Sequence, residues 1–121
     1  MERVSLNSIK DLQSAILKND TTILFFSNKG ELSNSVRESL EKIEKTYPCK
    51  SVSYIEIPDV GIVVREHLGI RTLPSVFLFN NGVLVNEYNP YREHSFQKIF
   101  EIIDLTVAIS NGLGLEGIRS A

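Results

Sequence analysis

A short apolar stretch, bounded by turn-forming residues, dominates the hydrophobic pattern of this chain. Residues 76–79 form an unbroken apolar run, which is typical of a strand covered on both faces. Asn81 and Gly82 follow the run and accept the positive φ angles of a two-residue hairpin turn. The pattern therefore predicts that residues 83–88 return as an antiparallel strand.

Pro74 lies immediately before this predicted strand, where a proline cannot donate a hydrogen bond to the sheet. An X–Pro peptide bond loses only about 0.5–1 kcal/mol when it is cis, against roughly 2.5–4 kcal/mol for other residues. We therefore expect a cis peptide bond between Leu73 and Pro74.

Hydrophobic periodicity predicts three more strands and four helices. Residues 21–26 are rich in β-branched and aromatic side chains, which indicates a buried central strand. Residues 51–57 alternate, and this alternation places Val52, Tyr54 and Glu56 on one face. The other predicted elements are a first strand at residues 3–6, a helix at residues 8–18, a second helix ending at Pro48, a third at residues 62–68 and a last one ending by residue 111.

The ends of three helices carry recognisable signals. Residues 8–11, Ser-Ile-Lys-Asp, have the form of a capping box for the first helix. The sequence leaves two starts open for the second helix, either at Gly30 or through a capping box at residues 35–38. Gly69 is expected to close the third helix as its C′ residue.

These elements follow one another in the order βαβαβαββα, which is typical of an α/β fold. A predicted helix connects the strand at residues 21–26 to the strand at residues 51–57. We therefore expect these two strands to be parallel and joined by a right-handed crossover.

The block Gly69-Ile70-Arg71-x-x-Pro74, followed by an apolar strand and Asn-Gly, resembles the second half of the thioredoxin domain. The resemblance implies a thioredoxin fold, a three-layer α/β/α arrangement with a mixed central sheet. It carries the cis-proline of that family onto Pro74. We expect one thioredoxin-like domain at residues 1–111 and a flexible C-terminal tail at residues 112–121.

Composition narrows the classes of function. The chain has 121 residues, 42% of them hydrophobic and 23% charged, and a formal net charge of -2, which gives no basic field for nucleic acid. No apolar run approaches the roughly 18 residues of a membrane span, and the first residues lack the apolar core of a signal peptide. A lone cysteine excludes an intrachain disulfide framework and fits a reducing compartment, so we expect a cytoplasmic protein.

In thioredoxin-like oxidoreductases a Cys-x-x-Cys pair stands where the helix begins after the first central strand. Free N–H groups and the helix dipole stabilise the thiolate there. An ungapped count from the predicted strand places this motif on Gly30, Glu31, Leu32 and Ser33. Neither cysteine position carries sulfur, and the buried acid of the family falls on Leu24. The resemblance therefore implies a site without redox chemistry, and we predict no catalytic residue.

Other candidates for chemistry are few. Cys49 is a candidate reactive thiol, although a small half-buried side chain is the simpler interpretation of its place after Pro48. His67 and His94 have no cysteine or carboxylate at the spacing of metal ligands. We therefore expect neither a metal nor a cofactor.

Two classes of function stay open from the sequence. The first is a non-redox binding module, in which Thr72, Leu73 and Pro74 hold a protein, a peptide or a second copy of the chain by β-augmentation. The second is a redox protein related to cell redox homeostasis that acts through Cys49 or a partner's cysteines. A glutathione-type ligand at the same backbone ranks last, because only Lys29 and Arg71 are near enough in sequence to meet its carboxylates. The first class is favoured, with no role for nucleic acid or membrane and no enzymatic activity.

Overall fold

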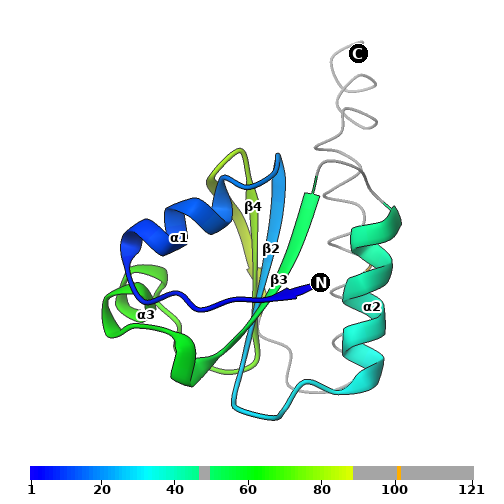
Figure 1. Ribbon diagram of the computed structural model, residues 1–121, viewed down its shortest axis with the longest axis horizontal. Helices are drawn as coiled ribbons and strands as arrows, with labels where there is room; N and C mark the ends of the chain where they lie inside the picture. Colours follow the sequence, from blue (N-terminus) through cyan, green and yellow to red (C-terminus); the bar gives the residue numbers. More distant parts are fainter. Residues whose placement is uncertain (47–49, 89–100, 102–121) are drawn as a thin grey trace.

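A five-stranded mixed sheet forms the centre of the molecule in the computed structural model (Figure 1). The structure describes residues 1–46, 50–88 and 101. The strands lie in the spatial order β1-β3-β2-β4-β5. Their bounds are Glu2–Arg3 for β1, Thr21–Ser27 for β2, Lys50–Glu56 for β3, Ser75–Asn80 for β4 and Val83–Tyr88 for β5.

Strand β2 is the centre of the sheet, paired parallel with β3 and antiparallel with β4. Helix α2, Asn34–Thr46, makes the connection between β2 and β3, and the predicted parallel pairing is confirmed. All seven residues of β2 are buried, as expected for a strand with neighbours on both sides and helices on both faces.

The hairpin predicted around Asn81 and Gly82 is also confirmed. Their φ angles are 52° and 79°, the positive values that a two-residue hairpin turn needs. Strands β4 and β5 pair antiparallel on either side of this turn, with an irregular register between Leu78 and Phe79. Such a shift is the mark of a β-bulge, which increases the local twist of the edge strand.

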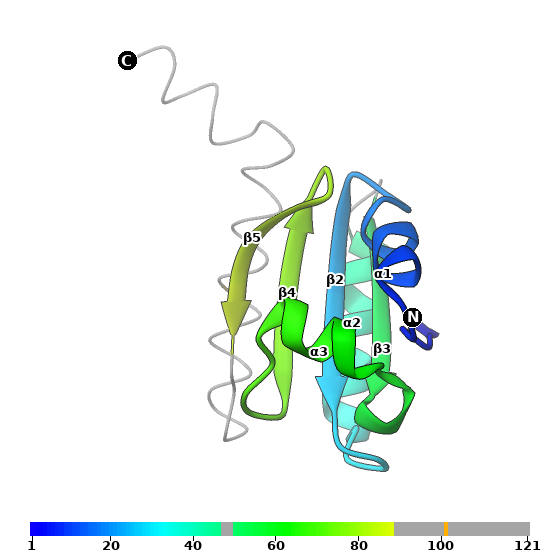
Figure 2. The same ribbon diagram turned by 90° about the vertical axis from the view of Figure 1, so that its left-hand side faces the viewer.

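The helices cover the sheet on both faces and give three layers. Helices α1, Ile9–Ile16, and α3, Ile62–Leu68, lie on one face, and α2 lies on the other (Figures 1 and 2). A short 3-10 helix, Ile57–Asp59, leads from β3 towards α3. The predicted α/β class with a mixed central sheet is confirmed.

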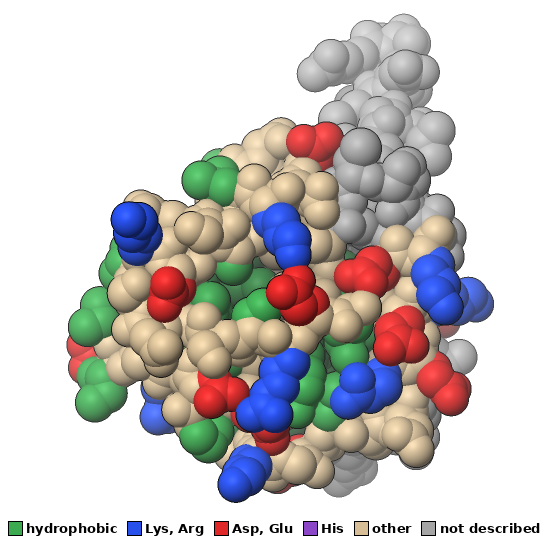
Figure 3. Space-filling view, in the orientation of Figure 1, with side chains coloured by type: hydrophobic (Ala, Val, Ile, Leu, Met, Phe, Trp, Pro, Cys, Tyr) green, Lys and Arg blue, Asp and Glu red, His purple; other side chains and the backbone are tan. Residues whose placement is uncertain are grey.

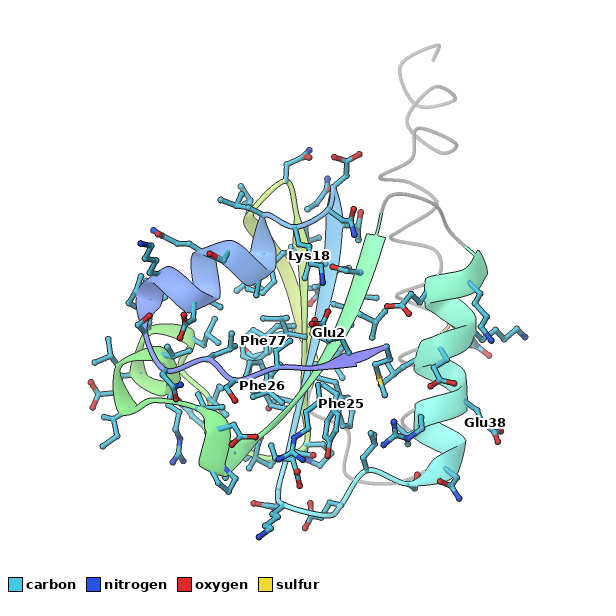
Figure 4. The ribbon with its side chains drawn as sticks, viewed as in Figure 1. Glu2, Lys18, Phe25, Phe26, Glu38 and Phe77 are labelled. Carbon is cyan, nitrogen blue, oxygen red and sulfur yellow. The ribbon has the colours of Figure 1, made fainter. Side chains whose placement is uncertain are left out.

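Each face of the sheet has its own hydrophobic core. In the core beneath α1 and α3, the rings of Phe26 and Phe77 meet edge to face with their centroids 5.5 Å apart (Figure 4). This geometry suits the aromatic quadrupole better than a stacked sandwich does. The core beneath α2, called the α2-side core below, consists of Ile23, Phe25, Val36, Leu40, Val52, Tyr54, Val76 and Leu78.

Two predicted strands differ from what the structure shows. The first strand is only Glu2–Arg3, because the chain leaves the ladder and Leu6 forms a separate parallel bridge with Val60. The strand predicted at residues 51–57, with Val52, Tyr54 and Glu56 on one face, is residues 50–56, and residues 51–56 are all buried. Strand β3 lies between β1 and β2 with helices on both faces, so neither face is open.

The capping signals predicted for α1 and α3 are found, with one change of partner, although α1 ends at Ile16 and not at residue 18. Ser8 Oγ accepts the N–H of Asp11 at 3.2 Å, as a capping box requires. The Asp11 carboxylate, however, accepts the N–H of Asn7 at 2.9 Å, one residue before the expected donor. Gly69 ends α3 in the left-handed conformation, with φ 67°, as predicted. Apart from residue 101, which is helical, the predicted last helix lies outside the described residues, as does the tail at residues 112–121.

Candidate functional site at the end of the sheet

The register of the sheet brings three chain segments together at one end. Ser27 at the end of β2 lies opposite Glu56 at the end of β3. On the other side of β2, Phe26 lies opposite Ser75, the first residue of β4. The loop that leaves β2 and the Leu73–Pro74 segment that enters β4 therefore start from neighbouring positions.

The loop after β2 begins with a tight turn. The N–H of Glu31 donates to the carbonyl of Asn28 at 3.2 Å, and the Asn28 side-chain amide donates to the Glu31 carboxylate at the same distance. Gly30 is the third residue of this turn and has φ 75°. A type II turn needs a positive φ at that position, which explains a glycine there without any reference to a lost nucleophile.

Helix α2 begins after this turn, at Asn34. Ser33 caps it, because its Oγ accepts the N–H of Val36 at 3.3 Å and its carbonyl accepts the N–H of Arg37 at 3.0 Å. Both starts left open by the sequence, at Gly30 and at a capping box from residue 35, are therefore wrong. The helix N-terminus lies at Ser33, so Gly30 precedes the helix and does not open it.

Glu56 is the residue of this site whose role the sequence did not reveal. Its side chain is only about 6% exposed, and Oε2 accepts the N–H of Gly30 at 2.5 Å. Oε1 lies 2.8 Å from Nη2 of Arg3. A buried carboxylate needs such partners, since an unpaired buried charge is strongly unfavourable. The alternation of residues 51–57 did signal that Glu56 shares a face with Val52 and Tyr54, but not what it would bind.

Arg3 and Tyr54 extend this polar group. Nη2 of Arg3 also donates to Asp59 Oδ2 at 2.9 Å, and this hydrogen bond, together with the charge of Glu56, raises the pKa of Arg3. Burial raises the pKa of the Tyr54 phenol, and its hydrogen-bonding interaction with Glu56 raises it further. The guanidinium of Arg37 lies 5.8 Å from the centre of the Tyr54 ring, within the range of a cation–π contact.

Ser27 is an exception to the rule that buried polar groups are paired. The residue is 1% exposed, and within the described residues its Oγ is a buried side-chain oxygen without a hydrogen-bond partner. Leaving such a group unsatisfied costs about 1–3 kcal/mol. Alternation along β2 puts Ser27 on the same face as Ile23 and Phe25, which is the face of α2.

The segment before β4, residues 72–74, is held in place by a hydrogen bond and by side-chain packing. The Leu73–Pro74 peptide bond is cis. The hydroxyl of the fully buried Ser75 donates to the carbonyl of Thr72, and the Leu73 side chain packs against the core beneath α1 and α3. Among the described residues, no hydrogen bond reaches the backbone N–H or carbonyl of Leu73. Within the described part of the chain, half-buried Leu73 thus has one backbone donor and one backbone acceptor without a partner.

The remaining sequence candidates are not part of this site as described. His67 is exposed on α3. Cys49 and His94 lie outside the described residues. Within the described part of the chain, no group of three or more histidine, cysteine or acidic residues could hold a metal ion. Leu24, where the resemblance places the family's buried acid, is fully buried in the core beneath α1 and α3.

Solved structures with this architecture identify the fold. A mutant thioredoxin of Halobacterium salinarum is 16% identical at a TM-score of 0.67, over 88% of this chain and 91% of that one. A thioredoxin of Plasmodium falciparum is 18% identical at a TM-score of 0.65, over 84% of this chain and 97% of the other. A designed protein is 19% identical at a TM-score of 0.67, over 87% and 100% of the two chains. The chain has the thioredoxin fold. No protein-family model and no curated protein matches its sequence.

The thioredoxin fold is present here without the Cys-x-x-Cys motif, because the whole chain has a single cysteine. The helix that carries the motif in the family is α2 here, and it is capped by the hydroxyl oxygen of Ser33. Serine at this place completes the helix end, but a hydroxyl is far harder to deprotonate than a thiol and is a weak nucleophile without an activating base. The described helices are also too short or too polar to span a lipid bilayer.

Proposed function

We propose that this protein is a redox-inactive thioredoxin-fold module that binds an extended segment of a protein or peptide beside Leu73 and Pro74. The observation that carries the proposal is the backbone of Leu73, whose N–H and carbonyl have no partner among the described residues while its side chain is anchored in the core. A segment that pairs with this backbone would satisfy both groups. Recognition of this kind needs main-chain hydrogen bonds and no sulfur.

Charge and composition favour a polypeptide over other partners. The formal net charge is -2, and acidic and basic side chains are interspersed over the face shown in Figure 3. Nucleic acids select a concentrated positive surface, so neither a nucleic acid nor a membrane is part of the proposal. With one cysteine in the chain, the cytoplasm is the proposed location. The proposal covers both a different protein and a second copy of this chain as the partner.

The proposal is tested with peptides selected by display against the native protein. Leu73→Pro removes the backbone N–H, whereas Leu73→Ala keeps that N–H and also removes most of the leucine side chain from the core. Loss of one hydrogen bond that leaves a partner unsatisfied costs about 1–3 kcal/mol, so Leu73→Pro should weaken a selected peptide about tenfold relative to Leu73→Ala. Circular dichroism checks that both variants are folded.

The same peptide provides an independent check by nuclear magnetic resonance. The amide of Leu73 should be among the most shifted on binding and should become protected from exchange. Equal affinities for the two Leu73 variants, or shifts centred on α3 around the exposed Ile62, would contradict binding at this edge.

A further inference from the structure

The loop between β2 and α2 is fixed at its middle by one buried side chain. Gly30 donates its N–H to Glu56 Oε2 at 2.5 Å, and Glu56 is in turn paired with Arg3 at 2.8 Å. Residues 29–31 are otherwise exposed, and the described contacts that hold them besides this one are the turn bonds between Asn28 and Glu31. The hydrogen bond to a charged acceptor is therefore the main tie between this loop and the sheet, because such bonds are about twice as strong as neutral ones.

The ends of the loop are better anchored than its middle. On one side the chain enters from β2, and on the other Leu32 packs against the α2-side core and Ser33 caps α2. Gly30, with its positive φ, stands between these two anchors. Movement that breaks the Glu56 bond would thus be confined to the few exposed residues of the turn.

A second observation concerns Ser27, the neighbour of Glu56 in the sheet. Ser27 lies directly opposite Glu56 in the β2–β3 ladder, on the same face, and its buried Oγ has no partner in the described part of the molecule. An orphaned hydroxyl is a free-energy cost that any incoming hydrogen-bonding group could relieve. Ser27 also ends the strand that runs beside β4, whose first residue follows Pro74.

We propose that Glu56 is a positioning residue that latches residues 28–32 to the end of the sheet beside Ser27, and that opening of this latch lets a segment bound beside Leu73 hydrogen-bond to the Ser27 hydroxyl. The proposal rests on the proposed function for the identity of the incoming segment. The latch itself is a property of the free protein. Its chemistry is a simple exchange: the Gly30 N–H passes from the carboxylate to water, and the Ser27 hydroxyl gains a partner from the bound backbone.

The latch is tested first without any ligand, by amide hydrogen exchange. Gly30 should be protected in the native protein and should lose about tenfold or more of its protection in Glu56→Ala. Glu56→Gln keeps a carbonyl oxygen that can accept the same N–H but loses the charge that pairs with Arg3. It should therefore be intermediate, and it replaces Glu56→Ala if that variant does not fold.

Glu38→Gln is the matched control, because Glu38 lies exposed on α2 away from the sheet (Figure 4). It should leave the exchange of Gly30 unchanged. A Gly30 amide that exchanges freely in the native protein, or is as well protected in the Glu56 variants as in the native protein, would overturn the latch whatever the protein binds.

The coupling to binding is tested with the same display-selected peptide. If residues 28–32 must move before the peptide can contact Ser27, weakening the Glu56 bond lowers the free-energy cost of that movement. The Glu56→Gln variant should therefore bind the peptide several-fold more tightly than native protein does. Ser27→Ala should abolish that gain when combined with Glu56→Gln. Unchanged or weaker binding of Glu56→Gln refutes the coupling. If no peptide binds native protein, the proposed function fails while Gly30 exchange still decides the latch.

Discussion

At the scale of single residues, the presence of a glycine at position 30 has two different explanations, one from the resemblance to thioredoxins and one from the local backbone geometry. The ungapped count from the resemblance to thioredoxins makes Gly30 an empty cysteine position. The structure makes it the third residue of a tight turn, with φ 75° and a backbone N–H bound to Glu56. The second reason is physical and can be tested by substitution.

Gly30→Ala should destabilise the protein by about 1–2 kcal/mol, the cost of holding an ordinary residue in the left-handed region. Beyond the adjoining residues 29 and 31, no atom lies within 4 Å of the place that an alanine Cβ would take, so backbone conformation is the source of the cost. Gly30→Asn should recover part of it, because asparagine tolerates positive φ. Urea denaturation measures both, and equal loss in the two variants would contradict this origin.

Tyr54 gives a prediction about pH. Burial and Glu56 raise the pKa of its phenol above the ordinary value of about 10. The protonated phenol therefore contributes stability that is fully present below about pH 10 and is lost as pH rises towards the raised value. In Tyr54→Phe the free energy of unfolding should fall less steeply above pH 10 than in native protein. Parallel curves for the two proteins would show that Tyr54 is not the group responsible.

At the scale of elements, helix α2 decides where the family's chemistry could be restored. An ungapped count puts the two cysteine positions at Gly30 and Ser33, but the helix begins at Asn34 with Ser33 as its cap. Its free N–H groups are therefore near Ser33, and the residue one turn later is Val36.

The double variant Ser33→Cys with Val36→Cys should form a disulfide readily, because residues three apart at a helix start lie within disulfide reach. Gly30→Cys with Ser33→Cys should oxidise less completely, since it needs a positive φ at a cysteine. Alkylation under oxidising and reducing conditions, with Cys49→Ser as background, measures the difference. Preferential pairing of the second variant would show that the ungapped placement is the better guide to the site.

Much of the fold could be predicted because its signals are local. The Asn81–Gly82 turn, the C′ glycine at Gly69 and the apolar run of β4 can each be recognised within a few residues. The role of Glu56 could not be predicted, because its partners Gly30 and Arg3 are far away in sequence. The predicted start of α2 was wrong for a related reason. Ser33 and Ser35 are both acceptable helix caps by residue type, and only the turn before Ser33 decides between them.

At the scale of the whole molecule, the chain keeps the architecture of thioredoxins while the positions of their sulfur chemistry hold other residues. The mixed five-stranded sheet and the Leu73–Pro74 segment that leads into β4 are present. At the end of β2 and the start of α2 stand a turn glycine, a capping serine and a carboxylate that occupies a loop N–H. The proposed separation of the thioredoxin scaffold from its redox reaction rests on this combination of residues.

The insulin reduction assay with dithiothreitol tests that separation most directly. The native protein should reduce insulin disulfides no faster than the reductant alone, because a thiol exchange cycle needs a thiolate nucleophile and a resolving thiol. Cys49→Ser should behave in the same way. Turnover comparable to that of a thioredoxin, abolished in Cys49→Ser, would contradict a redox-inactive module and make Cys49 the centre of its function.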